Sequence, residues 1–251
     1  MASHILSIYY QNVRGLNTKL NELSTNILSN DYSIIALTET WLDSSVYDCE
    51  VCKEQYRVYR VDRVRGSTGR GGGVLTAVKE GLAVLKAEPV SSSFEGLLLK
   101  ISIHGQTWFI VNVYIPPSSK VEVYCQAFQW LESHYEMQDG NLILIGDMNI
   151  PSITDNNCDL NATEQSRELK NFINLYNLNS CNSIQNSNNK TLDLVLTSHS
   201  IMNVKCTRNT DPLLAEDLHH PALDIAMQAA SKSKKREIGC QTLYNFKNAN
   251  F

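Results

Sequence analysis

The sequence predicts an α/β protein in which helices pack outside layers of β-strands. Two observations favour this class. Segments whose apolar residues recur at helical spacing are interspersed with segments that alternate, or run continuously, in apolar residues. Several of these strand segments also follow one another through hairpin turns, which disfavours a purely parallel array of strand–helix–strand units. At 251 residues the chain suits one large domain or two small ones.

The first half of the chain begins with a strand and a helix. Residues 4–12 alternate in polarity, and four apolar residues then recur on one face of a helix: Leu16, Leu20, Leu23 and Ile27. Further strands are expected at 33–39, 56–64 and 74–78, followed by a hairpin that joins 97–103 to 107–114. A helix is expected from 121 to 135, because the apolar residues return to helical spacing there.

The second half is organised around residues 142–149. Four apolar residues predict a buried strand that ends at Gly146, Asp147 and Asn149. On an extended backbone Asp147 and Asn149 face one side, and Gly146 lets a substrate approach the main chain. The alternative is a strand end followed by an Asx-turn. A helix at 169–176 and strands at 191–197 and 222–227 follow, so we expect a domain over 1–227 and a basic linker or disordered tail over 228–251.

Composition limits the compartment and the partners. No apolar run has membrane-spanning length and the N-terminus lacks a signal peptide, so we expect a soluble intracellular protein with no membrane partner. Seven scattered cysteines indicate reduced thiols, and the lone pair Cys49 and Cys52 lacks the two further ligands that structural zinc needs. The net charge of -4 and the pI of 5.9 disfavour a protein that coats nucleic acid with its whole surface, although they allow a local basic patch.

The clearest basic segment before the tail runs from Lys53 to Lys79 and includes a loop rich in glycine and arginine, Arg65–Gly73. This loop is neither a P-loop nor a dinucleotide-binding motif, because a strand rather than a helix is expected after the glycines. Two interpretations are open, a surface that contacts phosphate groups and a solvated hairpin with long basic side chains. Arg65 and Arg70 in this loop, with Arg14 after the first strand, are candidate phosphate contacts.

Polar side chains of complementary types lie at or near the expected strand ends, where a rigid scaffold usually presents functional groups. They are Asn12, Glu39, Tyr114, Asp147, Asn149, Asp193 and His219. Each alone is also explained as a cap, turn or surface residue. Together they supply the parts of metal-assisted phosphodiester hydrolysis.

The roles follow from the side-chain chemistry. Glu39 offers a hard carboxylate for Mg²⁺, and Asn12 helps position the ion or its waters. Asp147 orients and deprotonates a water, and Asn149 holds Asp147 or the phosphate. A protonated His219, fixed by Asp193, stabilises charge on phosphorus. Tyr114 donates a hydrogen bond to a phosphate oxygen.

The chain resembles the endonuclease/exonuclease/phosphatase superfamily and, within it, the apurinic-like endonuclease domain of non-LTR (LINE-type) retrotransposons, particularly Jockey-like elements. The resemblance spans residues 4 to 227 and rests on seven short motifs in order. They are Gln11-Asn12-Val13-Arg14-Gly15-Leu16, Thr38-Glu39-Thr40-Trp41-Leu42, Gly71-Gly72-Gly73-Val74, Val113-Tyr114-Ile115-Pro116-Pro117, Gly146-Asp147-Met148-Asn149, Thr191-Leu192-Asp193-Leu194-Val195-Leu196-Thr197 and His219-His220-Pro221.

This resemblance implies a four-layer α/β sandwich, in which two packed mixed β-sheets are flanked by helices and the site lies at one end of the sheets. It also implies the roles given above for the polar residues at the strand ends. One motif departs from the family pattern Ser-Asp-His-x-Pro. With Pro221 as the anchor, His219 matches the histidine but Leu218 stands where the acid is expected. Three readings are open: Asp217 replaces that acid as a metal ligand, the acid is absent, or His220 is the catalytic histidine.

The function that the resemblance implies is a Mg²⁺-dependent endonuclease, with Mn²⁺ as a second choice of metal, that nicks one strand of double-stranded DNA. The exposed 3′-hydroxyl would prime reverse transcription in the nucleus by the reverse transcriptase domain of the same polyprotein. Arg14, Arg65 and Arg70 would contact DNA, and the loops 65–73 and 156–163 would read groove shape. The alternatives are a cellular abasic-site repair nuclease, a catalytically inactive DNA-binding module and, more distantly, a lipid or inositol phosphatase.

Overall fold

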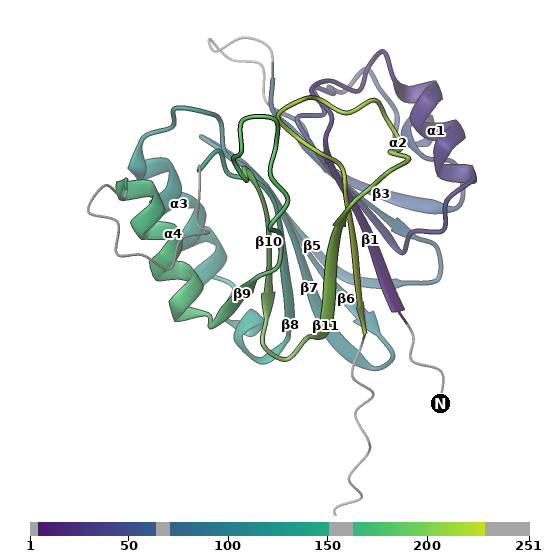
Figure 1. The fold of residues 1–251 in the computed structure, drawn as a ribbon. Helices are drawn as coiled ribbons and strands as arrows, with labels where there is room; N and C mark the ends of the chain where they lie inside the picture. The colour runs from purple at the N-terminus through teal and green to yellow at the C-terminus, as the bar shows by residue number, and fades with distance from the viewer. Residues whose placement is uncertain (1–4, 64–70, 151–162, 229–251) are drawn as a thin grey trace, which may run out of the picture.

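Two six-stranded β-sheets pack face to face, and helices cover the outer side of each (Figure 1). The structure is a computed structural model that describes residues 5–63, 71–150 and 163–228. In sheet order, the first sheet contains β11 (Met202–Arg208), β12 (Leu223–Gln228), β1 (Ile5–Asn12), β2 (Ile34–Thr38), β4 (Val74–Lys79) and β3 (Tyr56–Val61). The second contains β5 (Ala83–Ser91), β6 (Glu95–Ile103), β7 (Gln106–Tyr114), β8 (Asn141–Asp147), β10 (Asp193–Ser198) and β9 (Leu178–Ser180).

The helices form the two outer layers. The first sheet is covered by α1 (Leu20–Leu28) and the short α2 (Asp48–Val51), and the second by α3 (Val121–Glu132) and α4 (Glu164–Leu175), with a 3-10 helix, η1 (Tyr135–Asp139), before β8. Within each sheet one pair of strands is parallel, β1 with β2 and β7 with β8, and the other described pairs are antiparallel. The predicted four-layer sandwich with two mixed sheets is confirmed.

Strand β8 illustrates why a continuous apolar run forms a strand here. Ile143 and Ile145 face the core between the two sheets, whereas Leu142 and Leu144 pack beneath α3 and α4. Because neighbouring side chains of a strand point to opposite faces, a strand covered on both faces needs apolar residues at every position. Apolar packing on both sides therefore fixes the strand that carries Asp147 at its end.

The strand register gathers polar residues at one end of the molecule. Asp147 lies opposite Tyr114 on β7 and opposite Asp193 on β10. In the first sheet Asn12 is paired with Thr38, so Glu39 follows directly after the neighbouring strand end. The polar residues that end the strands of the two sheets therefore lie together, as the sequence predicts.

Four elements have no counterpart in the sequence prediction: α2, β5, β9 and β11. Strands β5 and β11 lie at sheet edges, and their residues are half-buried or exposed along the whole strand. Without one buried face, an edge strand shows no apolar alternation.

Among the described residues, no helix combines the length and the apolar composition needed to cross a membrane.

Candidate active site

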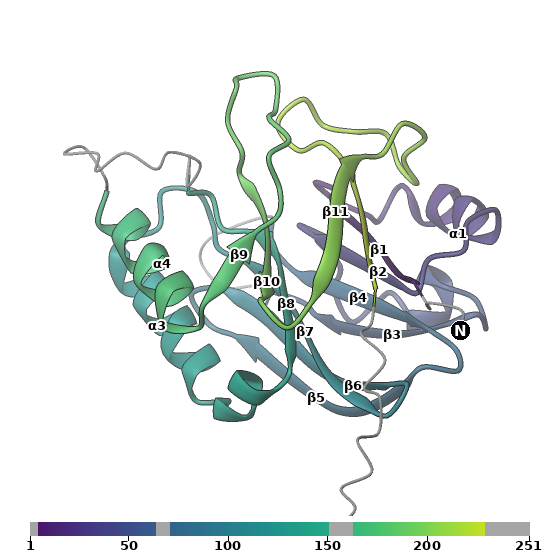
Figure 2. The ribbon, with the colours of Figure 1, turned by 60° about the horizontal axis from the view of Figure 1, so that its bottom comes forward.

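A cluster of two carboxylates and one imidazole lies where the two sheets end. Glu39, Asp147 and His220 each place one potential ligand atom within 4.8 Å of the others. Glu39 follows β2, Asp147 ends β8, and His220 lies in the loop that leads into β12. Figure 2 shows this loop beside the loop between β9 and β10, at one end of the sheets. Three segments far apart in the sequence thus meet at one point.

Asn12 joins the two carboxylates of this cluster. Its amide nitrogen donates hydrogen bonds to Glu39 Oε1 at 3.1 Å and to Asp147 Oδ2 at 2.9 Å. Its amide oxygen accepts from the backbone N–H of Arg14 at 3.1 Å. Asn12 therefore positions the two carboxylates by donating hydrogen bonds to them, and its role in positioning a metal ion or its waters stays a prediction.

The histidine of the cluster is His220, and the expected pairing of Asp193 with His219 is wrong. His220 Nδ1 lies 3.1 Å from Asp193 Oδ2, and His220 Nε2 lies 3.7 Å from Asp147 Oδ2. His219 is only partly buried and contacts Asn188 Nδ2 at 3.3 Å. The physical reason is a tight turn in which His220 N donates to Asp217 O, which turns the second histidine inward.

Tyr10 is a member of the site that the sequence prediction missed. Its hydroxyl donates to Asp193 Oδ1 at 2.8 Å and lies 3.0 Å from Thr38 Oγ1. Tyr10, Asp193 and His220 thus form a buried chain of contacts. The alternation of β1 was the available signal, because Tyr10 shares a strand face with Asn12.

The opposite face of β1 fixes the loop that carries His220. Gln11 donates to the backbone oxygen of Leu214 at 3.0 Å, and Tyr9 accepts from the backbone N–H of Leu213 at 3.0 Å. Tyr9 also donates to Gln11 Oε1 at 2.6 Å. One strand therefore holds the site residues with one face and the loop of His220 with the other.

Asp217, predicted as a metal ligand, has other partners. Its Oδ2 forms a 2.8 Å ion pair with Arg14, and its Oδ1 accepts from the backbone N–H of His219 at 2.9 Å. Asp217 is outside the three-residue cluster found among the described residues. Leu218, in the place of the expected acid, is 77% exposed. Arg14 itself is about half-exposed at the edge of the site, so it is accessible to a ligand.

Asn149 and Gly146 act through the main chain. Asn149 has a φ of 51°, and its backbone N–H donates to Asp147 Oδ1 at 2.9 Å, which is the Asx-turn alternative. Its side chain donates to the backbone oxygen of Ile115 at 2.9 Å. A Cβ on Gly146 would lie 1.9 Å from the oxygen of Val113, so the glycine serves the close approach of β7 rather than of a substrate.

Tyr114, at the end of β7, lies near the carboxylates of Glu39 and Asp147. Burial raises the pKa of Tyr114 well above its usual value, and the charges of Glu39 and Asp147 raise it further. The phenol therefore stays protonated beside these two carboxylates. Tyr114 is therefore a hydrogen-bond donor at any physiological pH.

The two central groups have displaced pKa values. Burial, followed by the charge of Asp193, raises the pKa of Asp147 to about 7. Burial alone would lower the pKa of His220, but the hydrogen bond and charge of Asp193, with the charges of Asp147 and Glu39, raise it to about 9. Near neutral pH His220 is therefore protonated, and Asp147 is poised to accept a proton.

The donor set fits a hard divalent cation. Glu39 and Asp147 are neighbouring carboxylates, and Mg²⁺ commonly takes one or two protein carboxylates and completes its shell with water and phosphate oxygens. A protonated His220 is not a ligand, so these two carboxylates would hold the ion.

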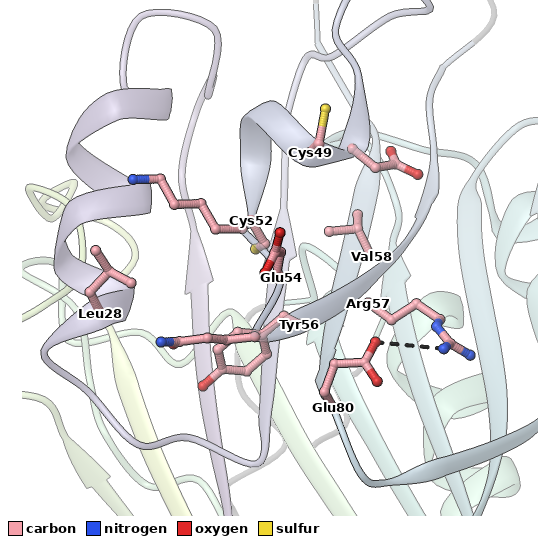
Figure 3. A pocket seen from close by; sticks show the side chains of 11 residues that line it. Leu28, Cys49, Cys52, Glu54, Tyr56, Arg57, Val58 and Glu80 are labelled. Atoms are coloured by element: carbon pink, nitrogen blue, oxygen red, sulfur yellow. Dashed lines mark ion pairs between the residues drawn. The ribbon is translucent and has the colours of Figure 1, made fainter.

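Other predicted features lie apart from this site. Arg65, Arg70 and residues 156–162 are outside the described residues. A hollow of about 730 Å³ lies at the start of β3, at the far end of that strand from the cluster, and both Cys49 and Cys52 line it (Figure 3). No group of three metal-ligating side chains includes these cysteines among the residues that the structure describes.

Known proteins match part of this sequence and share its fold. A family model described as endonuclease-reverse transcriptase matches residues 108–219. The matched segment contains Tyr114, Asp147 and Asp193 but neither Glu39 nor His220. A search of curated proteins finds no match.

Solved structures share the fold over most of the chain. The human Nocturnin catalytic domain has a TM-score of 0.65 at 14% identity, covering 89% of this chain and 93% of that one. The endonuclease domain of TRAS1, a telomere-specific non-LTR retrotransposon, has a TM-score of 0.61 at 12% identity, covering 89% and 99%. An endonuclease/exonuclease/phosphatase family protein from Leptotrichia buccalis has a TM-score of 0.62 at 12% identity, covering 89% and 100%. The chain thus has the fold of these proteins.

Proposed function

We propose that the protein is a metal-dependent DNA endonuclease that nicks one strand of double-stranded DNA for a non-LTR retrotransposon. The observation that carries the proposal is the cluster of Glu39, Asp147 and His220, with Asp193 behind the histidine. The family model for endonuclease-reverse transcriptases and the fold shared with the TRAS1 endonuclease domain support the substrate and the biological setting. A Jockey-like origin is part of the proposal.

The contacts of each side chain indicate its role in the proposed hydrolysis. Asp147 is held by Asn12 and by the backbone of Asn149, and of its two carboxylate oxygens one accepts the proton of the attacking water while the other would hold the metal ion. His220, held protonated by Asp193, stabilises the negative charge that develops on the phosphate. Tyr114 donates a hydrogen bond to a phosphate oxygen. A Mg²⁺ ion held by Glu39 and Asp147 would neutralise phosphate charge, and Mn²⁺ is the second choice.

The product and its use complete the proposal. Hydrolysis leaves a 3′-hydroxyl in the nicked strand, and this end primes reverse transcription in the nucleus. The reverse transcriptase domain of the same polyprotein is the proposed partner, and the basic residues beyond 228 would lead toward it. Arg14, Arg65 and Arg70 are proposed DNA contacts.

Nicking of supercoiled plasmid tests the proposal. We expect Mg²⁺-dependent conversion to open circles, an end that a DNA polymerase extends without pretreatment, and no activity in EDTA. Asp147→Ala is expected to be inert, whereas the matched surface variant Asp31→Ala keeps full activity, because Asp31 pairs with Lys79 away from the site. Wild type that leaves plasmid intact but binds it would indicate an inactive DNA-binding module.

A second substrate separates the proposal from DNA repair. Duplexes with and without one abasic site are compared at equal concentration. Similar nicking of both agrees with a retrotransposon endonuclease. A strong preference for the abasic duplex would instead identify an abasic-site repair nuclease, because that role needs a pocket for the extruded sugar.

A further inference from the structure

A buried ion pair adjoins Tyr114. Arg63 Nε lies 2.6 Å from Glu95 Oε1, and Arg63 Nη2 lies 2.8 Å from Glu95 Oε2. Glu95 is fully buried, and the Arg63 side chain is 20% exposed. Buried ion pairs contribute little net stability, because desolvation of the two charges offsets their attraction. The pair therefore calls for a role other than stability.

The geometry ties this pair to the site. Glu95, the first residue of β6, is the cross-strand partner of Tyr114. The guanidinium carbon of Arg63 lies 5.6 Å from the centre of the Tyr114 ring. A cation over an aromatic ring attracts it, and two parallel hydrogen bonds fix the plane of the guanidinium group. Arg63 is thus held by Glu95 in a position that restrains the Tyr114 ring.

Gly72, in the run of three glycines before β4, makes room for this arrangement. A Cβ on Gly72 would lie 2.4 Å from the guanidinium carbon of Arg63, so a side chain there would displace the arginine. The backbone oxygen of Gly72 accepts from the N–H of Trp41 at 2.9 Å, two residues after Glu39. Gly72 therefore contacts both the Arg63 side chain and the segment that carries Glu39.

We propose that Glu95 and Arg63 form a positioning pair that holds the Tyr114 phenol toward Glu39 and the substrate phosphate. The inference rests on the proposed nuclease function and adds two residues that act through Tyr114. Lysine cannot replace Arg63, because its ammonium group lacks the planar pair of donors that Glu95 accepts.

A double-mutant cycle tests whether Arg63 acts through Tyr114. Arg63→Lys and Glu95→Gln are each expected to lower kcat by about 10- to 100-fold with little change in KM, because small misplacements of a positioned group cost this much. In a Tyr114→Phe background the same changes are expected to cost no more than about twofold, since interacting residues are not additive. Full additivity in the cycle overturns the proposal. Glu95→Gln keeps the side-chain size and covers the case in which Arg63→Lys fails to fold.

The arginine at the other end of β3 supplies a matched control. Arg57 and Glu80 form an ion pair with an N–O distance of 3.6 Å, and their side chains are 63% and 51% exposed (Figure 3). Arg57→Lys and Glu80→Gln are expected to leave kcat and KM unchanged. A loss from Arg57→Lys equal to that from Arg63→Lys would show a general effect of arginine replacement and overturn the proposal.

An NMR experiment tests this inference independently of the proposed function. In protein with ¹³C-labelled tyrosine, the ring signal of Tyr114 is assigned by its absence in Tyr114→Phe. Arg63→Lys and Glu95→Gln are expected to shift that signal, and Arg57→Lys is expected to leave it in place. If wild type does not nick DNA, the function fails while this arm still decides the inference. An unmoved Tyr114 signal in both site variants overturns the positioning pair.

Discussion

His219 and His220 are adjacent in the sequence but differ in burial and in partners. His220 is 6% exposed and contacts both Asp193 and Asp147, whereas His219 is partly exposed and contacts Asn188. His220→Ala is expected to lower the rate of plasmid nicking by at least about 100-fold, because it removes electrostatic stabilisation of the phosphate. His219→Ala is expected to stay within about twofold of wild type, as surface substitutions usually do. A larger loss from His219→Ala than from His220→Ala would reverse the assignment.

The raised pKa of His220 also makes the stability of the metal-free protein depend on pH. The folded-state pKa is about 9 and the ordinary value is 6.5, so the folded protein holds this proton more tightly than the unfolded chain does. The stabilisation is complete below pH 6.5 and is lost as the pH rises through 9. It amounts to roughly 3 kcal/mol.

Urea denaturation in EDTA at several pH values from 6 to 9.5 measures this effect. We expect the free energy of unfolding of wild type to fall over this range, and we expect a shallower fall for His220→Gln. Asp147, with its pKa raised from 3.8 to about 7, adds a fall of the same sign at lower pH, so the two proteins are compared at each pH. Equal slopes for wild type and His220→Gln would contradict the prediction.

At single residues, the sequence indicated the types of side chain better than their contacts. Glu39 and Asp147 were found because each follows an apolar run that ends in a polar residue. The choice between His219 and His220 depends on the tight turn from Asp217 to His220, which no periodicity reveals. Tyr10 was missed, because its contact with Asp193 forms only when the second sheet packs against the first.

At the scale of elements, the approach of β7 to β8 depends on Gly146. A Cβ at this position would lie 1.9 Å from the backbone oxygen of Val113. Gly146→Ala is therefore expected to separate the two parallel strands and to lower the free energy of unfolding by roughly 3 kcal/mol or more. Thermal and urea denaturation would measure this loss.

A second glycine provides the control for this substitution. Gly105, in the hairpin between β6 and β7, has a φ of +73° and nothing within 4 Å of an added Cβ. Asparagine tolerates this backbone conformation, so Gly105→Asn is expected to cost less than about 1 kcal/mol. If the two variants were equally stable, the close strand contact would not be the reason for the glycine at 146.

Interior strands were predictable, whereas three of the four edge strands, β5, β9 and β11, were missed; the fourth, β3, was predicted at 56–64. Strands β7 and β8 have buried faces that impose apolar patterns, and both were predicted near their observed bounds. Strand β5 contains Lys86, Glu88 and Pro89 along an edge of the second sheet, so its identity as a strand depends on pairing with β6. The local sequence does not show which segments pair at a sheet edge, and this is why β5 and β11 were missed.

At the scale of the whole molecule, the site is assembled from both sheets. Glu39 directly follows β2 of the first sheet and Asp147 ends β8 of the second, and hydrogen bonds from Asn12 and Tyr10 cross between the sheets. A cation that binds both carboxylates would therefore oppose separation of the sheets. This links occupancy of the site to the stability of the fold, because a ligand that binds only the folded state stabilises it.

Mg²⁺ is accordingly expected to raise the thermal midpoint of wild type. At a concentration 100-fold above the dissociation constant, binding contributes about 2.7 kcal/mol, which corresponds to roughly 5 to 10 °C for a protein of this size. Glu39→Gln and Asp147→Asn should lose most of this rise, whereas Glu54→Gln on the hollow of Figure 3 should keep it. Differential scanning calorimetry with and without Mg²⁺ measures the shift. An equal rise in all four proteins would place the bound ion elsewhere, and the two sheets would then meet at Glu39 and Asp147 without sharing a metal.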